Sequence, residues 1–184
     1  MKFYHGSNNA NLKELTTDHY MGKLYLTDSY SMAIMYGGCP LRNWNYNKEK
    51  DLLILNEVNE KAFEIMYKGK TCYIYTCEVR DAIKDETNIS NHTYIVNHNV
   101  KLNEEKEIII DAYEKILELE KEGKVKLNRW EDYSDEEKNI KKERTINHWK
   151  PHMQNEYNNF PYEYELLTKI FPELKIEDDK KCQR

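Results

Sequence analysis

Residues 23–38 have the sequence KLYLTDSYSMAIMYGG and decide the fold, because they join a short strand directly to a helix. Residues 23–27 carry the aromatic and β-branched side chains that favour strands. Either Thr27 or Asp28 is a suitable N-cap for the helix that follows, and Gly37 is a suitable stop at its C-terminal end.

Three further strands are predicted around this unit. The first is Lys2-Phe3-Tyr4-His5, which ends at the turn-forming cluster Gly6-Ser7-Asn8-Asn9. Residues 71–79 (TCYIYTCEV) have the strongest strand composition of the chain, since β-branched and aromatic side chains dominate them. Residues 92–96 (HTYIV) predict another strand.

Residues 39–68 interrupt this pattern. Asn43-Trp44-Asn45-Tyr46-Asn47 is typical of an exposed loop with aromatic content, residues 51–56 predict a strand, and residues 60–67 predict a short helix. We interpret the whole segment as an insertion in the surrounding domain.

From Asn103 the apolar period changes from two to about three and a half. This pattern predicts a long helix, with Gly123 as its stop. Residues 124–130 predict a last strand.

The end of the chain is predicted to be helical. Ser134-Asp135-Glu136-Glu137 is a capping box that opens a highly charged helix, and Pro161 suits the first turn of another. Strands and a helix come first and helices are concentrated late, which indicates the α+β class. We predict one domain over residues 1–130, including the 39–68 insertion, and a charged helical extension over residues 131–184 packed on that domain.

Charge and hydropathy exclude two classes of partner. The 184 residues include 28 Lys and Arg against 33 Asp and Glu, a net charge of −5. Non-specific nucleic-acid binding depends on neutralising phosphates, so duplex nucleic acid is not an expected partner. No apolar run approaches the roughly 20 residues of a membrane span, and the first residues are too polar for a signal peptide. We expect a soluble, cytoplasmic protein without a membrane partner.

The sequence contains no P-loop, GxGxxG turn, GxSxG elbow or HExxH motif. Its four cysteines form no CxxC pair, so we interpret them as small hydrophobic residues. His148 and His152 have the spacing of helical metal ligands, but Pro151 between them breaks the helix that would align them. We therefore predict no metal site.

Tyr4-His5-Gly6-Ser7, followed by Tyr25-Leu26-Thr27 and then Tyr36, resembles the NAD-binding core of the ADP-ribosyltransferases. In the poly(ADP-ribose) polymerase branch a His-Gly-Ser precedes a Gly-x-Tyr-Phe-Ala strand, and a second tyrosine follows eleven residues after the first, as Tyr36 follows Tyr25. The rest of residues 3–130 is similar to the small rifampin ADP-ribosyltransferases. The resemblance implies a split, twisted antiparallel or mixed sheet with flanking helices, and NAD as a substrate.

The resemblance also implies roles for the His-Gly-Ser residues. Gly6 has no side chain, so its backbone would approach the nicotinamide carboxamide closely. Ser7 would add a hydroxyl hydrogen bond to the same amide. His5 would hydrogen-bond the adenosine ribose and, with Tyr25, would belong to the catalytic set.

By the same resemblance, Tyr25 and Tyr36 would sandwich the nicotinamide ring, whose positive charge suits the face of a tyrosine. Thr27 ends the same strand as Tyr25 and is included among the cofactor-binding residues. The alternative for Tyr36 is an ordinary aromatic residue of the core.

The remaining element of the family is a carboxylate that opposes the charge developing on the nicotinamide ribose. Aligned on the rifampin-modifying enzymes, the acidic loop that follows the Tyr73-Ile74-Tyr75 strand falls on Asp85-Glu86. We predict Glu86 as the catalytic carboxylate and Asp85 as a second candidate and cofactor contact. Aligned on the polymerase pattern Glu-Tyr-Ile-Val, the position falls on Thr93, which carries no charge. An acidic pair in a loop is also typical of a solvated surface.

The sequence thus favours an NAD-dependent mono-ADP-ribosyltransferase with a small-molecule or protein acceptor. A non-catalytic NAD-binding module with a degenerate site is a second hypothesis, favoured by Thr93 and opposed by the Asp85-Glu86 pair. A third is an RNA 2′-phosphotransferase, which also uses NAD. This third reading is less favoured because the first hundred residues contain only Arg42 and Arg80 to bind an RNA phosphate.

Overall fold

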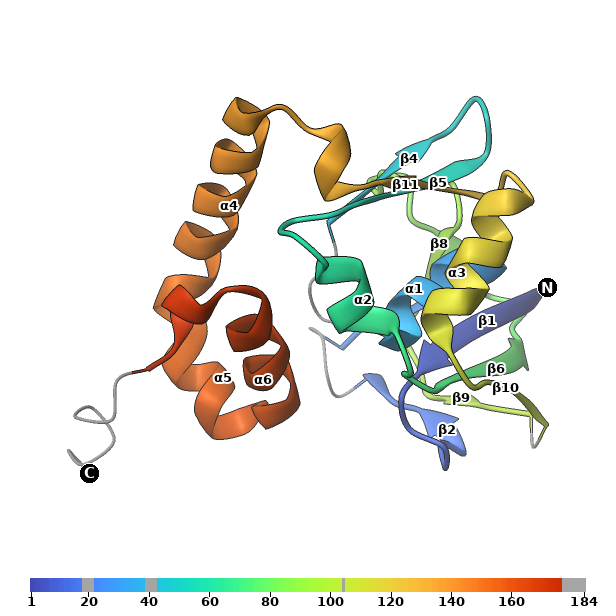
Figure 1. The fold of residues 1–184 in the computed structure, drawn as a ribbon. Coiled ribbons are helices and arrows are strands. Elements are labelled where there is room, and N and C mark those ends of the chain that lie inside the picture. Colours follow the sequence, from blue (N-terminus) through green and yellow to red (C-terminus); the bar gives the residue numbers. More distant parts are fainter. Residues whose placement is uncertain (18–21, 39–42, 104, 177–184) are drawn as a thin grey trace. The chain divides into compact units, whose positions relative to one another are not determined.

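A computed structural model describes residues 1–17, 22–38, 43–103 and 105–176, and its architecture is α+β, as the order of predicted elements indicated (Figure 1). The chain divides into two compact units. We call them the sheet unit (Met1–Leu55 and Tyr67–Leu127) and the helical unit (Asn56–Met66 and Asn128–Arg184).

The sheet unit is built on a six-stranded sheet in which every neighbouring pair of strands is antiparallel. In spatial order the strands are β10 (Lys106–Ile109), β6 (Cys72–Glu78), β1 (Lys2–Ser7), β3 (Leu24–Thr27), β8 (Thr93–Val96) and β7 (Ile83–Lys84). The strand with the His-Gly-Ser sequence and the strand with Tyr25 are therefore central neighbours.

The remaining described strands form two small sheets. One has the order β11 (Val125–Asn128), β5 (Leu52–Asn56) and β4 (Trp44–Asn47), and the other pairs β2 (Glu14–Leu15) with β9 (Val100–Lys101). The prediction of an exposed loop over residues 43–47 is wrong, because β4 pairs with β5 along its whole length. The partner strand β5 satisfies the backbone polar groups on one side of β4, and a local pattern cannot reveal this pairing.

Helix α1 (Tyr30–Gly38) packs against β1 and β6, and α3 (Ala112–Lys121) packs against α1 (Figure 1). The first of these contacts is unusually close. A Cβ atom at Gly6 would lie 1.7 Å from the carbonyl oxygen of Ala33, and one at Gly37 would lie 2.0 Å from the sulfur of Cys72. Only glycine allows the strand and helix backbones to approach in this way.

The opposite face of the sheet carries an apolar cluster. Because successive side chains of a strand alternate between faces, Phe3 points away from the helix that Gly6 touches. The cluster contains Phe3, Leu15, Leu24, Leu26, Cys77, Val79, Val96 and Val100. The strands that line the site below are thus packed on both faces.

The prediction of one long helix from Asn103 is wrong at its start. Residues 106–109 form the edge strand β10, and α3 begins after Asp111, whose side chain accepts hydrogen bonds from the backbone N–H groups of Tyr113 and Glu114. The isoleucines at 108–110 favour a strand, and Asp111 is an N-cap that the apolar period concealed.

The helical unit contains α2 (Ala62–Tyr67) as far as Met66, and all of α4 (Asp135–Trp149), α5 (Met153–Asn159) and α6 (Pro161–Ile170). It also has short 3-10 turns at Trp130–Asp132, Lys150–His152 and Pro172–Leu174. The predicted capping box is confirmed: Ser134 Oγ accepts from the Glu137 N–H, and Glu137 Oε2 accepts from the Ser134 N–H. Pro161 lies in the first turn of α6, as predicted.

The unit boundary at 127/128 lies close to the expected one at 130/131, but residues 56–66 group with the helical unit instead of the first domain. A buried carboxylate explains this grouping. Glu57 accepts hydrogen bonds from the N–H groups of Phe63 (3.1 Å) and Trp130 (2.7 Å), which fastens the start of α2 to the later segment. Burial raises the pKa of Glu57.

Candidate functional site

A cavity opens where the central strands β1 and β3 stop pairing. The two strands share a single register pair, Tyr4 with Thr27, whereas β1 pairs with β6 over all six of its residues. Beyond this pair lies a cavity of about 550 Å³, within the size range of small-molecule sites. Its lining residues are Tyr4, His5, Gly6, Tyr25, Leu26, Thr27, Ala33, Tyr36, Asp85, Asn88 and Thr93.

The lining falls into two walls. We call the residues of β1, β3 and α1 the strand wall, and the segment Asp85–Thr93 the loop wall. The strand wall contains five residues that the sequence proposed as NAD contacts, His5, Gly6, Tyr25, Thr27 and Tyr36. Both His5 and Tyr25 line the cavity, but the register pair Tyr4–Thr27 and the alternation of side chains place His5 and Tyr25 on opposite faces of the sheet. The prediction that both side chains face one cleft is therefore not confirmed.

The strand wall is positioned by packing. Gly6 lies directly against the backbone of α1, and this contact sets the depth of β1 beneath the helix. The helix starts at Ser29, whose Oγ accepts from the Met32 N–H, and not at Thr27 or Asp28 as the sequence suggested. Thr27 instead accepts from the Ser29 N–H at 3.1 Å, so the strand passes into the helix without a loop.

Tyr25 and Tyr36 approach the cavity from different elements. Tyr25 belongs to β3 and is 37% exposed, while Tyr36 lies in the last turns of α1. The ring of Tyr36 makes an edge contact with Trp44 of β4, with 6.5 Å between the ring centroids. Tyr36 is thus a cavity residue that also touches the β4–β5 hairpin.

The loop wall presents Asp85, not Glu86, to the cavity. The Asp85 N–H donates to the carbonyl of Thr93 (2.9 Å), and Asp85 Oδ1 accepts from the N–H and the hydroxyl of Thr87. Asp85 lines the cavity, whereas Glu86 is exposed and is not among the lining residues. Glu86, predicted as the catalytic carboxylate, thus lies outside the lining, and Asp85, the second candidate, lies in it.

Thr93 lies on the same wall, at the start of β8. It is buried, its hydroxyl lies 3.2 Å from that of Ser90, and its register partner is Thr27. The residue that aligns with the polymerase carboxylate and the acidic residue of the loop thus line one cavity together.

Ser7 does not line the cavity, contrary to the prediction for its hydroxyl. Its Oγ accepts from the N–H of Asn9 at 3.0 Å, an arrangement that stabilises the turn after β1. The lining also includes Tyr4, which belongs to the Tyr4-His5-Gly6-Ser7 motif, and Asn88, and neither was predicted as an NAD contact.

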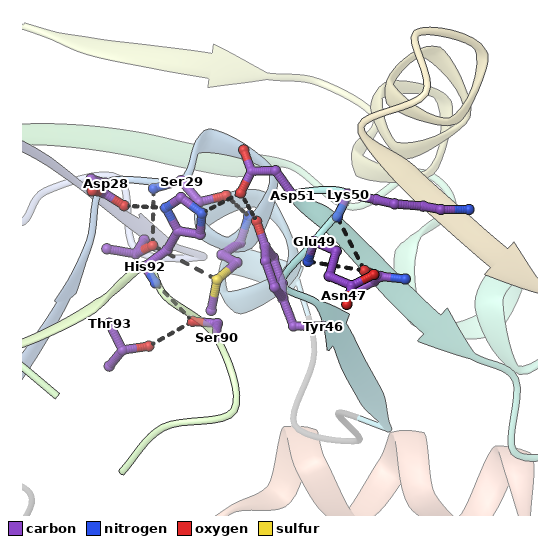
Figure 2. Close-up of polar contacts among 12 residues, drawn as sticks. Asp28, Ser29, Tyr46, Asn47, Glu49, Lys50, Asp51, Ser90, His92 and Thr93 are labelled. Carbon is purple, nitrogen blue, oxygen red and sulfur yellow. Dashed lines mark hydrogen bonds and ion pairs between the residues drawn. The ribbon is translucent and has the colours of Figure 1, made fainter. Parts of the chain in front are cut away.

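A charged cluster beside the cavity was also missed. His92 Nδ1 lies 2.5 Å from Asp28 Oδ1, and His92 Nε2 lies 2.6 Å from Asp51 Oδ1 (Figure 2). Tyr94 donates to Asp28 Oδ2, and Tyr46 donates to Asp51 Oδ1. The only sequence signal was that His92 directly precedes Thr93, because the three charged residues lie on segments far apart in the chain.

The described part of the chain has neither a metal-binding cluster nor a membrane-spanning helix. Among residues 1–17, 22–38, 43–103 and 105–176, no group of three or more His, Cys, Asp and Glu side chains could hold a metal ion. Within the same ranges, no helix combines the length and the apolar character needed to cross a bilayer.

Comparisons of the chain with protein-family models, with curated proteins and with solved structures find no match in any of the three.

Proposed function

We propose that the protein is an NAD-dependent mono-ADP-ribosyltransferase whose donor site is the cavity between β1 and β3. The observation that carries the proposal is the gathering of His5, Gly6, Tyr25 and Tyr36 around one cavity with a carboxylate, Asp85, on the facing wall. These residues come from β1, β3, α1 and the loop before β8, so their convergence is a property of the fold and not of one local motif.

Each wall suits one part of the donor. The aromatic faces of Tyr25 and Tyr36 suit the positively charged nicotinamide ring, and a cation over a tyrosine face is stabilised by about 0.5–2 kcal/mol. The carboxylate of Asp85 suits the ribose carbon that becomes positive when the bond to nicotinamide breaks. Oδ1 of Asp85 accepts hydrogen bonds from the N–H and the hydroxyl of Thr87.

The reaction exchanges one bond for another. The bond between the ribose carbon and the nicotinamide nitrogen breaks, and nicotinamide leaves with the bonding electron pair. A nucleophilic atom of the acceptor then forms a bond to the same carbon and loses its proton. Asp85 acts only while the carbon carries positive charge, so its contribution belongs to the transition state.

Thr93 supports a second candidate, an NAD-binding module without transferase activity. If the polymerase alignment holds, the carboxylate position is occupied by this buried, uncharged residue. The phosphotransferase alternative has less support, because the described lining residues include neither lysine nor arginine.

The test is incubation of the protein with NAD labelled in the adenylate part, alone and with candidate acceptors or cell lysate. We expect free nicotinamide and a labelled product to appear together. Saturable NAD binding without nicotinamide release would favour the binding module, and absence of NAD binding would refute both.

A further inference from the structure

The cluster around His92 links three segments that meet at the cavity. Asp28 follows β3, Asp51 lies in the turn between β4 and β5, and His92 directly precedes β8 (Figure 2). Both ring nitrogens of His92 face a carboxylate oxygen, at 2.5 and 2.6 Å. The backbone of Asp51 has a positive φ of 52°, which marks the turn that presents its side chain.

This geometry determines the charge of the ring. Ionised carboxylates only accept hydrogen bonds, and a neutral imidazole has a single N–H, so two such bonds require the imidazolium form. Burial opposes that form, but the hydrogen bonds that His92 donates to Asp51 and Asp28 outweigh it and raise the pKa of His92. The hydrogen bonds from Tyr46 and His92 lower the pKa of Asp51.

The groups that face the ring come from every neighbouring element. Asp28 comes from the β3–α1 junction and Asp51 from the hairpin turn, and the ring of Tyr46 on β4 lies 5.3 Å from the imidazole. Tyr94 of β8 donates to Asp28 at 2.9 Å. One positive charge is therefore held between two negative charges, each of which also accepts from a phenol.

The cluster is joined to the cavity through adjacent residues. Asp28 follows Thr27 and His92 precedes Thr93, and these two threonines are register partners that line the cavity. The carbonyl of Thr93 in turn accepts from the Asp85 N–H. His92 is therefore connected to the loop wall through its chain neighbour Thr93 and the hydrogen bond from the Asp85 N–H.

We propose that His92 is a positioning residue: by binding Asp28 and Asp51 together, it fastens the β4–β5 turn to the end of the β3–β8 pair and fixes Thr93 and Asp85 against bound NAD. This inference rests on the proposed function. It adds a role for the β4–β5 hairpin, which also touches Tyr36 through Trp44.

The contribution of the His92 contacts should decrease as the pH rises. A histidine with a raised pKa in the folded protein contributes stability below its unfolded pKa of about 6.5, and the contribution is lost as the pH rises through the folded value. The neutral ring of His92 has one N–H, so it can donate a hydrogen bond to only one of the two carboxylates. Asp51 is expected to lose its hydrogen bond, because its side chain is 73% exposed and that of Asp28 only 21%.

The test compares wild type with Asp51→Asn and His92→Gln, and uses Glu49→Gln, an exposed carboxylate on the same turn, as the matched control. The dissociation constant of NAD is measured by calorimetry from about pH 5.5 to about pH 8.5, a range that spans the ordinary histidine pKa. Nitrogen-15 spectra of the histidine side chains report the protonation of the ring independently of NAD.

For wild type and Glu49→Gln, we expect a doubly protonated His92 at low pH and NAD affinity that falls about three- to tenfold as the ring deprotonates, the effect of one net hydrogen bond. Asp51→Asn and His92→Gln should bind at the weaker level at every pH. Wild-type affinity and pH dependence in both variants would show that the pH dependence does not come from His92 and would overturn the inference, as would a neutral His92 ring at low pH. If wild type binds no NAD at any pH, the proposed function fails and this inference with it.

Discussion

The two walls of the cavity are built by different forces. The strand wall is held by close packing, with Gly6 pressed against the backbone of α1 and an apolar cluster on the other face of the sheet. The loop wall is held by polar contacts among Asp85, Thr87, Ser90 and Thr93. Packing tolerates almost no change in volume, whereas a polar loop can be altered one contact at a time.

This difference indicates that the two walls have different roles. The strand wall supplies shape and aromatic surface, so its residues should determine whether the donor binds. The loop wall supplies charge, so its residues should determine how fast a bound donor reacts. Substitutions on the two walls should therefore separate affinity from turnover.

The largest effect is expected from Gly6→Ala. The added Cβ would meet a backbone carbonyl at 1.7 Å, which no side-chain rotation can relieve. We expect a loss of about 3 kcal/mol in the free energy of unfolding, measured by urea titration, together with loss of NAD binding. The adjacent Ser7→Ala is the control. A Gly6→Ala protein with wild-type stability and NAD affinity would contradict the packed wall.

The second-largest effect is expected from Asp85→Asn, which preserves the shape of the side chain and removes its charge. Turnover, measured as nicotinamide release, should fall on the order of 100-fold, while the dissociation constant of NAD changes little. Glu86→Gln is the matched control, because Glu86 is the exposed neighbour, and it should retain wild-type turnover. The reverse pattern would restore Glu86 as the catalytic carboxylate. If neither change affects an active enzyme, the charge comes from elsewhere.

A smaller effect is expected from Tyr36→Ala. Loss of one ring face should weaken NAD binding about fivefold, corresponding to about 1 kcal/mol of stacking. Tyr36→Phe keeps the ring and should bind NAD like wild type. Since Tyr36 also touches Trp44, unfolding measurements must show that the alanine variant is folded. Unchanged affinity in that folded variant would make Tyr36 an ordinary packing residue.

The smallest effect is expected from Ser7→Ala. The hydroxyl stabilises the turn at Asn9 and does not line the cavity, so NAD affinity should change by less than about twofold. A tenfold loss would show that the hydroxyl binds the carboxamide, as the sequence resemblance implied.

The sequence predicted the parts of the molecule that are determined locally. The strand-to-helix transition at Thr27–Tyr30 and the capping box at Ser134 depend on neighbouring residues, and both are present. β4 and β10 were missed because each is defined by a partner strand distant in the chain.

Within the site, the strand wall was predicted better than the loop wall for the same reason. The pleat of β3 places Tyr25 and Thr27 on one side, a relation that can be read from spacing alone. The choice between Asp85 and Glu86 depends on the bond from the Asp85 N–H to Thr93 and on Thr87. The His92 cluster joins segments near residues 28, 51 and 92, so no local pattern could have indicated it.

The most direct test of the central claim is an NMR measurement of contacts between nicotinamide and the protein, with a non-hydrolysable NAD analogue bound. We expect nuclear Overhauser effects from the nicotinamide ring protons to the aromatic protons of both Tyr25 and Tyr36, with amide shifts concentrated at His5, Gly6 and Asp85. Binding that shifts residues elsewhere, without contacts to either tyrosine, would contradict the assignment of this cavity as the NAD site.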